Sequence, residues 1–261
     1  MRANAIIRRS RVEHSQFNGI VVADADAAIE STLVRGVEPN LEVPGSATAA
    51  FIATFGDAPA TAKIRGCIFE EAGTIGLVVY GGEATVDATL VRESTLLPGF
   101  QQVRCVHVQQ AYVGSALGFC GRLIMNDSRV EGCDAVGISV ASSEVTLNNT
   151  VVRDARAIDG SAGDGLVAYA LDDPDACMAQ LAVTNGYLGE NARAAITNFG
   201  VNVSVGTTTF ECNAMDIHGQ NTRTDYQFVD LSGNHCGCAG EEHACRVVNA
   251  TLEPPAPLQS P

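Results

Sequence analysis

The sequence predicts an all-β fold, a single-stranded right-handed parallel β-helix, and three observations lead to this prediction. The first is a seven-residue phrase that occurs three times, at Ile29–Arg35, Val86–Arg92 and Leu147–Arg153. Weaker copies lie between and around these three, and they begin at Ile7, Ile64, Met125, Val183 and Val205. A short unit repeated along the whole chain is typical of a solenoid, in which each unit stacks on its neighbours.

The second observation is the spacing of the copies. Four steps are each 22 residues long: Ile7 to Ile29, Ile64 to Val86, Met125 to Leu147, and Val183 to Val205. The intervening steps are 35, 39 and 36 residues. We therefore expect about eight coils, in which a short coil alternates with a long coil that carries an insertion. Duplication of an ancestral two-coil unit would explain this alternation.

The third observation is a second strand that begins twelve residues after the start of each short coil. These strands are Gly19–Val22, Gly76–Val79, Gly137–Val140 and Ala195–Asn198. Strands this short, separated by Gly, Asn and Asp turns, leave no room for the crossover helix of a βαβ unit. A leucine-rich repeat has a similar period, but its Asn-centred consensus is missing. Stacked β-helix coils, roughly 4.8 Å apart, fit the pattern.

Period-two alternation predicts which side chains of each coil point inward. One position is always apolar, and it is occupied by Val12, Val34, Phe69, Val91, Val130, Val152, Leu188 and Phe210. Two residues earlier lies a ladder of small residues, formed by Ser10, Thr32, Cys67, Thr89, Ser128, Thr150, Gly186 and Thr208. We expect this ladder to be buried, with Cys67 as a free thiol, and a bend just before it at pairs such as Asn148-Asn149.

One residue beyond the inward apolar position, the side chain points outward and is usually charged. These residues are Glu13, Arg35, Glu70, Arg92, Glu131, Arg153, Gly189 and Glu211. Stacked coils would place opposite charges side by side. This charge ladder is either a binding strip or a solvated ladder that fixes the register of the coils. We favour the second interpretation, because a ladder that pairs its own charges has little left for a ligand.

The repeat pattern resembles the pectin-lyase-like superfamily of right-handed β-helices from Ile7 to about Cys212. The resemblance includes the Asn-bearing bend and the interior Ser/Thr ladder, but no catalytic motif. It implies a superfamily that contains polysaccharide lyases, glycoside hydrolases, esterases, epimerases and many non-catalytic surface proteins.

The net charge and the cysteine content limit the ligands that the protein could bind and the compartment in which it could act. The net charge of −14 argues against nucleic acid, and it disfavours acidic polymers unless a divalent cation bridges the two. No stretch is long and apolar enough to span a membrane. Nine Cys residues indicate a secreted or cell-surface protein, although no signal peptide begins the chain. We therefore expect a protein without its leader or a fragment of a longer one; the alternative is a cytosolic protein with reduced thiols.

Three insertions, 36–61, 93–122 and 154–180, leave at the same point of alternate coils. They should therefore line up along one side and border any groove. The candidate contacts within them are Asp154, Asp159, Asp164, His107 and Tyr112. We interpret His107 as a surface loop residue.

The third insertion is the most acidic. Asp164, Asp172, Asp173 and Asp175 could together bind Ca²⁺, and no other cofactor is indicated. Alternatively, Asp172, Asp173 and Asp175 could provide a general acid and base, and Arg153 could serve as the base of a lyase. The third possibility is a solvated loop.

The remaining Cys residues predict disulfides. We expect Cys105 and Cys120 to close the second insertion. After the solenoid, at residues 1–212, a C-terminal cap and Pro-rich tail occupies 213–261. Cys212, Cys236, Cys238 and Cys245 should form disulfides in this cap rather than a zinc site. No such cover lies at the N-terminal end, so further coils or another chain should cover it.

Two functions remain open. The first is a non-catalytic extracellular or cell-surface β-helix module: a scaffold, an adhesin or a glycan contact. The alternative is a polysaccharide-active enzyme, either a lyase or a glycoside hydrolase, with a groove bordered by the three insertions.

Overall fold

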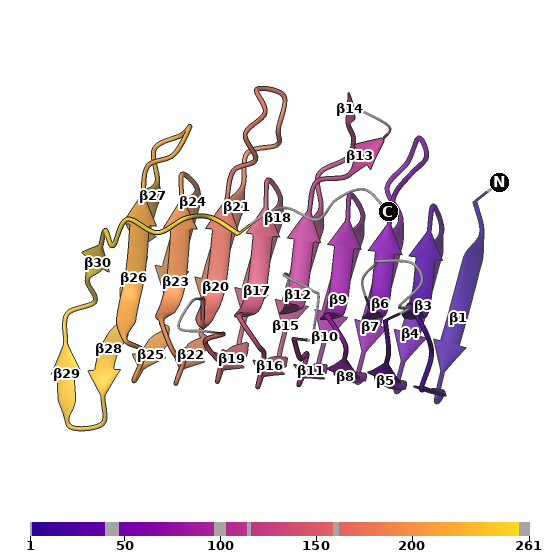
Figure 1. Ribbon diagram of the computed structural model, residues 1–261, viewed down its shortest axis with the longest axis horizontal. Coiled ribbons are helices and arrows are strands. Elements are labelled where there is room, and N and C mark those ends of the chain that lie inside the picture. The colour runs from indigo at the N-terminus through magenta and orange to yellow at the C-terminus, as the bar shows by residue number, and fades with distance from the viewer. Residues whose placement is uncertain (1, 40–46, 97–102, 114–115, 159–161, 256–261) are drawn as a thin grey trace.

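The computed structural model describes residues 2–39, 47–96, 103–113, 116–158 and 162–255, and they form three long parallel sheets (Figure 1). The first sheet contains β1 (Asn4–Arg8), β4 (Asp26–Glu30), β7 (Thr61–Arg65), β10 (Glu83–Asp87), β15 (Arg122–Asn126), β18 (Glu144–Asn148), β21 (Gln180–Thr184), β24 (Asn202–Gly206) and β27 (Gln227–Asp230). The second contains β2 (Arg11–Glu13), β5 (Leu33–Val37), β8 (Ile68–Ala72), β11 (Leu90–Arg92), β16 (Arg129–Glu131), β19 (Val151–Arg153), β22 (Tyr187–Gly189), β25 (Thr209–Glu211), β28 (His235–Cys238) and the antiparallel β29 (Glu241–His243). The third contains β3 (Asn18–Ala23), β6 (Thr48–Ala53), β9 (Ile75–Tyr80), β12 (Arg104–Gln109), β17 (Val136–Ala141), β20 (Asp164–Tyr169), β23 (Ala194–Phe199), β26 (Met215–Gln220) and β30 (Val247–Val248).

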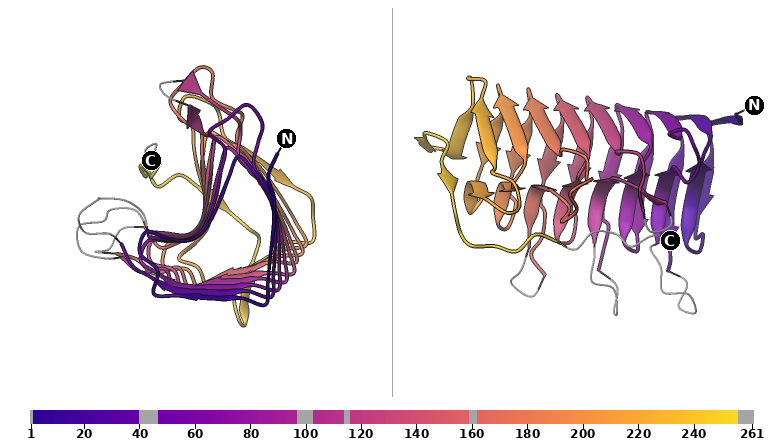
Figure 2. Two further views of the ribbon diagram at one scale, coloured as in Figure 1. Left: turned by 90° about the vertical axis from the view of Figure 1, so that its right-hand side faces the viewer. Right: turned by 90° about the horizontal axis from the view of Figure 1, so that it is seen from above.

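The chain visits the three sheets in turn, and every coil stacks on the previous one in parallel register (Figure 2). This confirms the predicted parallel β-helix. Stacking also continues beyond Cys212, where the sequence pattern was expected to end: β27, β28 and β30 pair in parallel with the preceding coil. The cap is therefore built on a ninth, shorter turn of the same solenoid.

The three predicted insertions are interrupted by regular secondary structure. Each contains one regular strand of the third sheet, respectively β6, β12 and β20. The described residues that follow β6, β12 and β20 form loops that line up along one edge of the third sheet (Figure 2). Residues 40–46, 97–102 and 159–161 of the insertions lie outside the described residues.

The bend before the small-residue ladder has a simple backbone origin. Ser31, Ala88 and Asn149 all adopt positive φ, at 48°, 48° and 49°. A residue in this left-handed conformation turns the chain sharply between the first and the second sheet. Thr32, Thr89 and Thr150 follow directly, and each hydroxyl donates to the carbonyl two residues earlier.

The interior is one continuous apolar cluster of mostly Val, Ile, Leu and Ala, and it extends from Ile20 to Cys236. The small-residue ladder is part of it: Thr32, Cys67, Thr89, Ser128, Thr150 and Thr208 are all buried. Cys67 is a free, buried thiol, as predicted, and burial raises its pKa. Gly76, the second residue of β9, must be small because a Cβ there would lie 2.4 Å from the Val91 side chain.

At the C-terminal end, Cys212 pairs with Cys238 and Cys236 with Cys245. This confirms the predicted disulfide cap. At the other end, β1, β2 and β3 are edge strands, and Ile6 is 64% exposed. That further coils or another chain cover this edge stays a prediction. The described residues contain no helix with the length and apolarity needed to cross a membrane.

Candidate ligand-binding face

The charge ladder lies on the outer face of the second sheet with the predicted register. Glu13, Arg35, Glu70, Arg92, Glu131 and Arg153 occupy matching positions of successive strands. Ion pairs join them two by two.

Each of these pairs links residues 22 positions apart, that is, the two coils of one repeat unit. Arg35 pairs with Glu13, Arg92 with Glu70 at 2.6 Å, and Arg153 with Glu131 at 3.1 Å. Because each Arg already has a carboxylate, Arg153 does not stand free as a base. The ladder pairs its own charges, as the favoured interpretation requires.

The outer face of the third sheet has a different character, and we call it the third-sheet face. Its side chains point away from the solenoid core and form two separate apolar clusters of their own. Between these apolar residues lie polar side chains with almost no solvent contact, namely Arg104, His107, Gln109, Ser139, Asp164, Thr197 and His218. The described residues of the loops after β6, β12 and β20 border one edge of this face (Figure 2).

Arg104, His107 and Gln109 lie along β12 and form a buried hydrogen-bonded chain. Arg104 Nη1 lies 2.8 Å from His107 Nδ1, and His107 Nε2 lies 3.0 Å from Gln109 Oε1. Arginine can only donate, so Nδ1 must accept and Nε2 must carry the proton. Burial and the Arg104 charge hold the pKa of His107 well below its usual value, which agrees with this neutral imidazole. His107 is therefore not the surface loop residue that we predicted.

Further along the same face, Asp164 at the start of β20 is completely buried. Arg193 forms a two-pronged ion pair with it, in which Nε lies 2.8 Å from Oδ1, and the backbone N–H of Ala194 also donates to Oδ1. At the other end of β20, burial raises the pKa of Tyr169, although Arg104 and Ser139 act in the opposite direction. Asp164 and Arg193 are thus fixed as a pair in the floor of the face.

Strands β23 and β26 carry polar atoms that have no hydrogen-bond partner among the described residues. Among the described residues, no hydrogen bond reaches Thr197 Oγ1, Gln220 Oε1 or either ring nitrogen of His218. Thr197 and His218 have no exposed surface at all. The His218 ring packs against Phe199, with ring centroids 5.5 Å apart, and burial lowers its pKa. Buried polar atoms of this kind are costly unless something bonds them.

At the N-terminal end of the face, aromatic rings gather in spite of the low aromatic content of the chain. The ring centroids of Phe51 and Tyr80 are 6.4 Å apart, and those of Phe55 and Tyr80 are 6.3 Å apart. Phe55 is 40% exposed, and Tyr112 packs against the same cluster. The backbone N–H of Tyr112 donates to the Tyr80 hydroxyl at 2.7 Å. We call Phe51, Phe55, Tyr80 and Tyr112 the aromatic platform.

One border of the face is held together across the second and third insertions. Cys120 forms a disulfide with Cys177, and the backbone N–H of Cys177 donates to Gln110 Oε1 at 2.8 Å. A hollow of about 350 Å³ lies next to this link, and its lining includes Asp173, Cys177 and Arg223. These contacts position the loops after β12 and β20 as one rigid border.

The predicted pairing of Cys105 with Cys120 is wrong. Cys105 bonds Cys133 of the following coil, and Cys120 bonds Cys177. The reason is the strand that the sequence interpretation missed: β12 begins just before Cys105 and carries the chain roughly 20 Å away before Cys120 is reached.

The predicted calcium set is separated for a similar reason. Asp164 opens β20, whereas Asp172, Asp173 and Asp175 follow its other end, and the six residues of β20 span roughly 20 Å. Asp164 is also already paired with Arg193. Within the described residues, no three His, Cys, Asp or Glu side chains are placed to share a metal ion. These four carboxylates therefore do not form one site.

The remaining candidates are scattered. Asp172 and Asp175 are exposed, and half-buried Asp173 accepts the Asp175 N–H at 2.9 Å. Asp154 is exposed in the turn after the charge ladder, beside Arg153. Asp159 lies outside the described residues. Of the predicted contacts, only His107, Asp164 and Tyr112 belong to or adjoin the third-sheet face.

Arg104, Tyr169, Thr197 and His218 were missed altogether. A signal was present, because Val106-His107-Val108 and Leu166-Val167-Ala168-Tyr169 repeat the apolar pattern of Gly76–Val79. This pattern does not fall at the constant spacing of the short coils, so the repeat alone does not predict these strands.

Comparison with known proteins agrees with this geometry. A family model described as a right-handed β-helix region matches residues 1–215. The crystal structure of the pectate lyase Pel9A matches with a TM-score of 0.58 and 12% sequence identity, over 88% of this chain and 55% of that chain. At this identity the likeness shows the fold alone, and the chain spans little more than half of Pel9A. No curated protein matches the sequence. The chain belongs to the right-handed β-helix family and has the pectin-lyase-like fold.

Proposed function

We propose that this protein is an extracellular glycan-binding β-helix module and that the third-sheet face is its contact surface. The aromatic platform is the observation that carries the proposal. An exposed ring such as Phe55 offers an apolar surface against which the C–H face of a sugar ring can pack. Polar side chains next to such a surface would fix the orientation of the hydroxyl groups.

The shape of the face supports a chain-like ligand. The matched positions of Phe51, Val78, His107, Ser139, Val167, Thr197 and His218 run across successive strands in one row. Neighbouring strands are roughly 4.8 Å apart, so this row extends for roughly 30 Å. The loops after β12 and β20, which the Cys120–Cys177 disulfide joins, would border an extended polymer on one side.

Charge supports a neutral ligand. The chain carries a net charge of −14, which would repel an acidic polymer over distances of about a Debye length. Asp164, a buried carboxylate in the floor of the face, is compensated by Arg193. Neutral polysaccharides therefore suit the face better than polyuronates.

Four disulfides support an extracellular location. Disulfides form and persist in oxidising compartments and are rare where glutathione keeps thiols reduced.

The test is a binding titration with cellohexaose, xylohexaose, mannohexaose and laminarihexaose, with and without Ca²⁺. We expect at least one to bind, and Phe55→Ala to weaken its binding about tenfold through the lost stacking surface. Tyr187→Ala is the matched control, because Tyr187 is a half-buried aromatic residue on the second sheet. Absence of binding by all four, or equal losses in both variants, would refute the proposal.

The same samples decide the alternative. If the protein is a polysaccharide lyase or a glycoside hydrolase, the bound hexasaccharide should be shortened, and new reducing ends or unsaturated products should accumulate. A bound and intact hexasaccharide supports the non-catalytic module.

A further inference from the structure

The chain returns over its own third-sheet face after the cap. Residues Asn249–Pro255, which we call the C-terminal segment, leave β30 and run back across the outer side of β26, β23 and β20 (Figures 1 and 2). The Leu252 side chain packs against the apolar cluster that contains Val136, Tyr169 and Phe199. The segment therefore lies on the third-sheet face, where the proposed ligand would lie.

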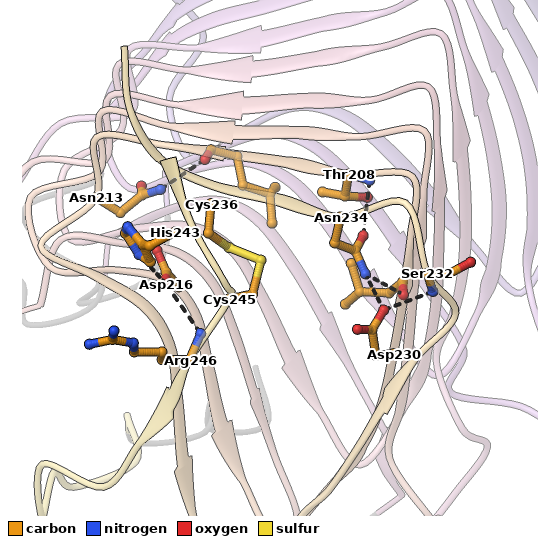
Figure 3. The surroundings of a disulfide bond; sticks show 12 residues. Thr208, Asn213, Asp216, Asp230, Ser232, Asn234, Cys236, His243, Cys245 and Arg246 are labelled. Carbon is orange, nitrogen blue, oxygen red and sulfur yellow. Dashed lines mark hydrogen bonds and ion pairs between the residues drawn. A yellow bond between two sulfur atoms is a disulfide. The ribbon is translucent and has the colours of Figure 1, made fainter. Parts of the chain in front are cut away.

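The chain just before the segment is firmly attached (Figure 3). Cys245 is tied to Cys236, and Asp216 accepts hydrogen bonds from His243 Nε2 at 2.9 Å and from the Arg246 backbone N–H at 3.3 Å. Val248 then pairs with His218 in the sheet. Up to this point the chain is part of the cap.

Beyond Val248 the attachment is much weaker. Asn249, Ala250, Thr251, Glu253 and Pro254 are exposed, whereas Leu252 and Pro255 are only partly buried. The backbone N–H of Thr251 donates to Asn249 within the segment itself. One apolar side chain, Leu252, thus provides the described packing against the face.

The segment also matches the surface beneath it poorly. Two of the strands it crosses, β23 and β26, carry Thr197 and His218, whose buried polar atoms have no hydrogen-bond partner among the described residues. Leaving such atoms unbonded destabilises the folded state. A partner rich in hydroxyl groups could bond them, and an apolar leucine cannot.

We propose that the C-terminal segment is a displaceable strap that occupies the glycan site and leaves it when a neutral oligosaccharide binds. The inference rests on the proposed function. It adds that the ligand must compete with the protein's own chain for the site. The apparent affinity is therefore the intrinsic affinity multiplied by the fraction of molecules in which the strap is open. Loss of the strap would then activate the site.

The experiment compares the full chain, a chain that ends at Val248, and Leu252→Ser in titrations with the four hexasaccharides named above. If the strap is closed in about nine molecules out of ten, its removal should tighten binding about tenfold. Leu252→Ser should give most of this gain. The control is Leu231→Ser, which alters a leucine that is 52% exposed and lies outside the segment.

A second readout follows the strap itself. In ¹³C-methyl-labelled protein, Leu252 should show signals shifted by the Tyr169 and Phe199 rings, and saturating hexasaccharide should move them to the positions of an unpacked leucine. Tighter binding to the truncated chain together with this movement supports the proposal. Equal binding by all forms, or tighter binding with unmoved Leu252 signals, overturns the strap alone. Absence of binding by every form, the truncated one included, overturns the proposed function and the strap with it.

Discussion

The outer faces of the second and third sheets are built by the same alternation and use it in opposite ways. On the second sheet, Arg92 and Arg153 reach across one coil to Glu70 and Glu131 and remain partly in solvent. On the third sheet, the outward-pointing His107, Asp164 and His218 have no exposed surface. An outward-pointing side chain in a β-helix is therefore not always in contact with solvent. The second-sheet face pairs its own charges and thereby holds the coils in register, whereas the third-sheet face keeps buried polar atoms without hydrogen bonds among the described residues, and it is the face that we propose for a ligand.

The largest expected effect concerns the border of the third-sheet face. Replacing both Cys120 and Cys177 with Ser removes a link between residues 57 positions apart. In the chain-entropy model, this loss lowers the free energy of unfolding by about 4 kcal/mol. Urea denaturation measures it. A loss under about 1 kcal/mol would contradict this expectation and would mean that the unfolded chain keeps structure near this link or that the crosslink strains the native fold.

The buried ion pair of the face comes next. Asp164→Asn should lower the free energy of unfolding by about 2–3 kcal/mol, because Arg193 keeps its charge and loses its partner. The loss is at the lower end for a buried pair, since the Arg193 side chain is still 24% exposed. Asp172→Asn, at an exposed position after the same strand, is the control and should change little. Equal effects of the two variants would contradict the burial of Asp164.

His107 links the third-sheet face to pH. Its pKa lies well below the usual value in the folded protein, so between pH 6.5 and that lower pKa the unfolded chain binds a proton that the folded protein does not. Stability is therefore complete above pH 6.5 and falls as the pH is lowered, by up to about 1.4 kcal/mol per pH unit. His107→Gln should flatten this slope, and exposed His235→Gln should not. An unchanged slope in His107→Gln would mean that this imidazole titrates normally.

The smallest expected effect lies on the second sheet. Arg92→Glu removes the pair with Glu70 and places like charges beside Glu70 and Glu131, at a cost of about 1 kcal/mol at low salt. The cost should shrink as salt rises, because the side chain at position 92 is partly exposed and its charge interactions are screened. Arg92→Gln, which only removes the pair, should cost less. Thermal denaturation at two salt concentrations separates these cases, and a loss that salt does not change would show that Arg92 acts through packing rather than charge.

The second sheet could be predicted because its residues lie at a fixed distance from the start of each repeat. The small residue, the apolar residue and the charged residue recur at the same spacing in every copy. This spacing places Glu13 to Arg153 in order along the sheet. The left-handed bend at Asn149 was predictable for the same reason, although Ser31 and Ala88 adopt it without the side chain that usually favours it.

The third-sheet face was not predictable from this pattern. Its strands in the long coils follow loops of variable length, so Arg104, Asp164 and the coils that contain them lose the constant spacing. Cys105 was given the wrong partner because pairing depends on which coils become neighbours. The position of Leu252 over Tyr169 joins residues 83 apart in the chain, and no local pattern encodes such a contact.

We propose that the third-sheet face binds the ligand and that the charge ladder holds the coils in register. The most direct measurement is an amide chemical-shift map of ¹⁵N-labelled protein titrated with the hexasaccharide that binds best. We predict that the perturbed amides cluster in β9, β12, β17, β20, β23 and β26 and in the loops beside them, whereas β11, β16 and β19 stay unchanged. Perturbations centred on Arg92, Glu131 and Arg153 would contradict the account and would make the ladder the binding strip.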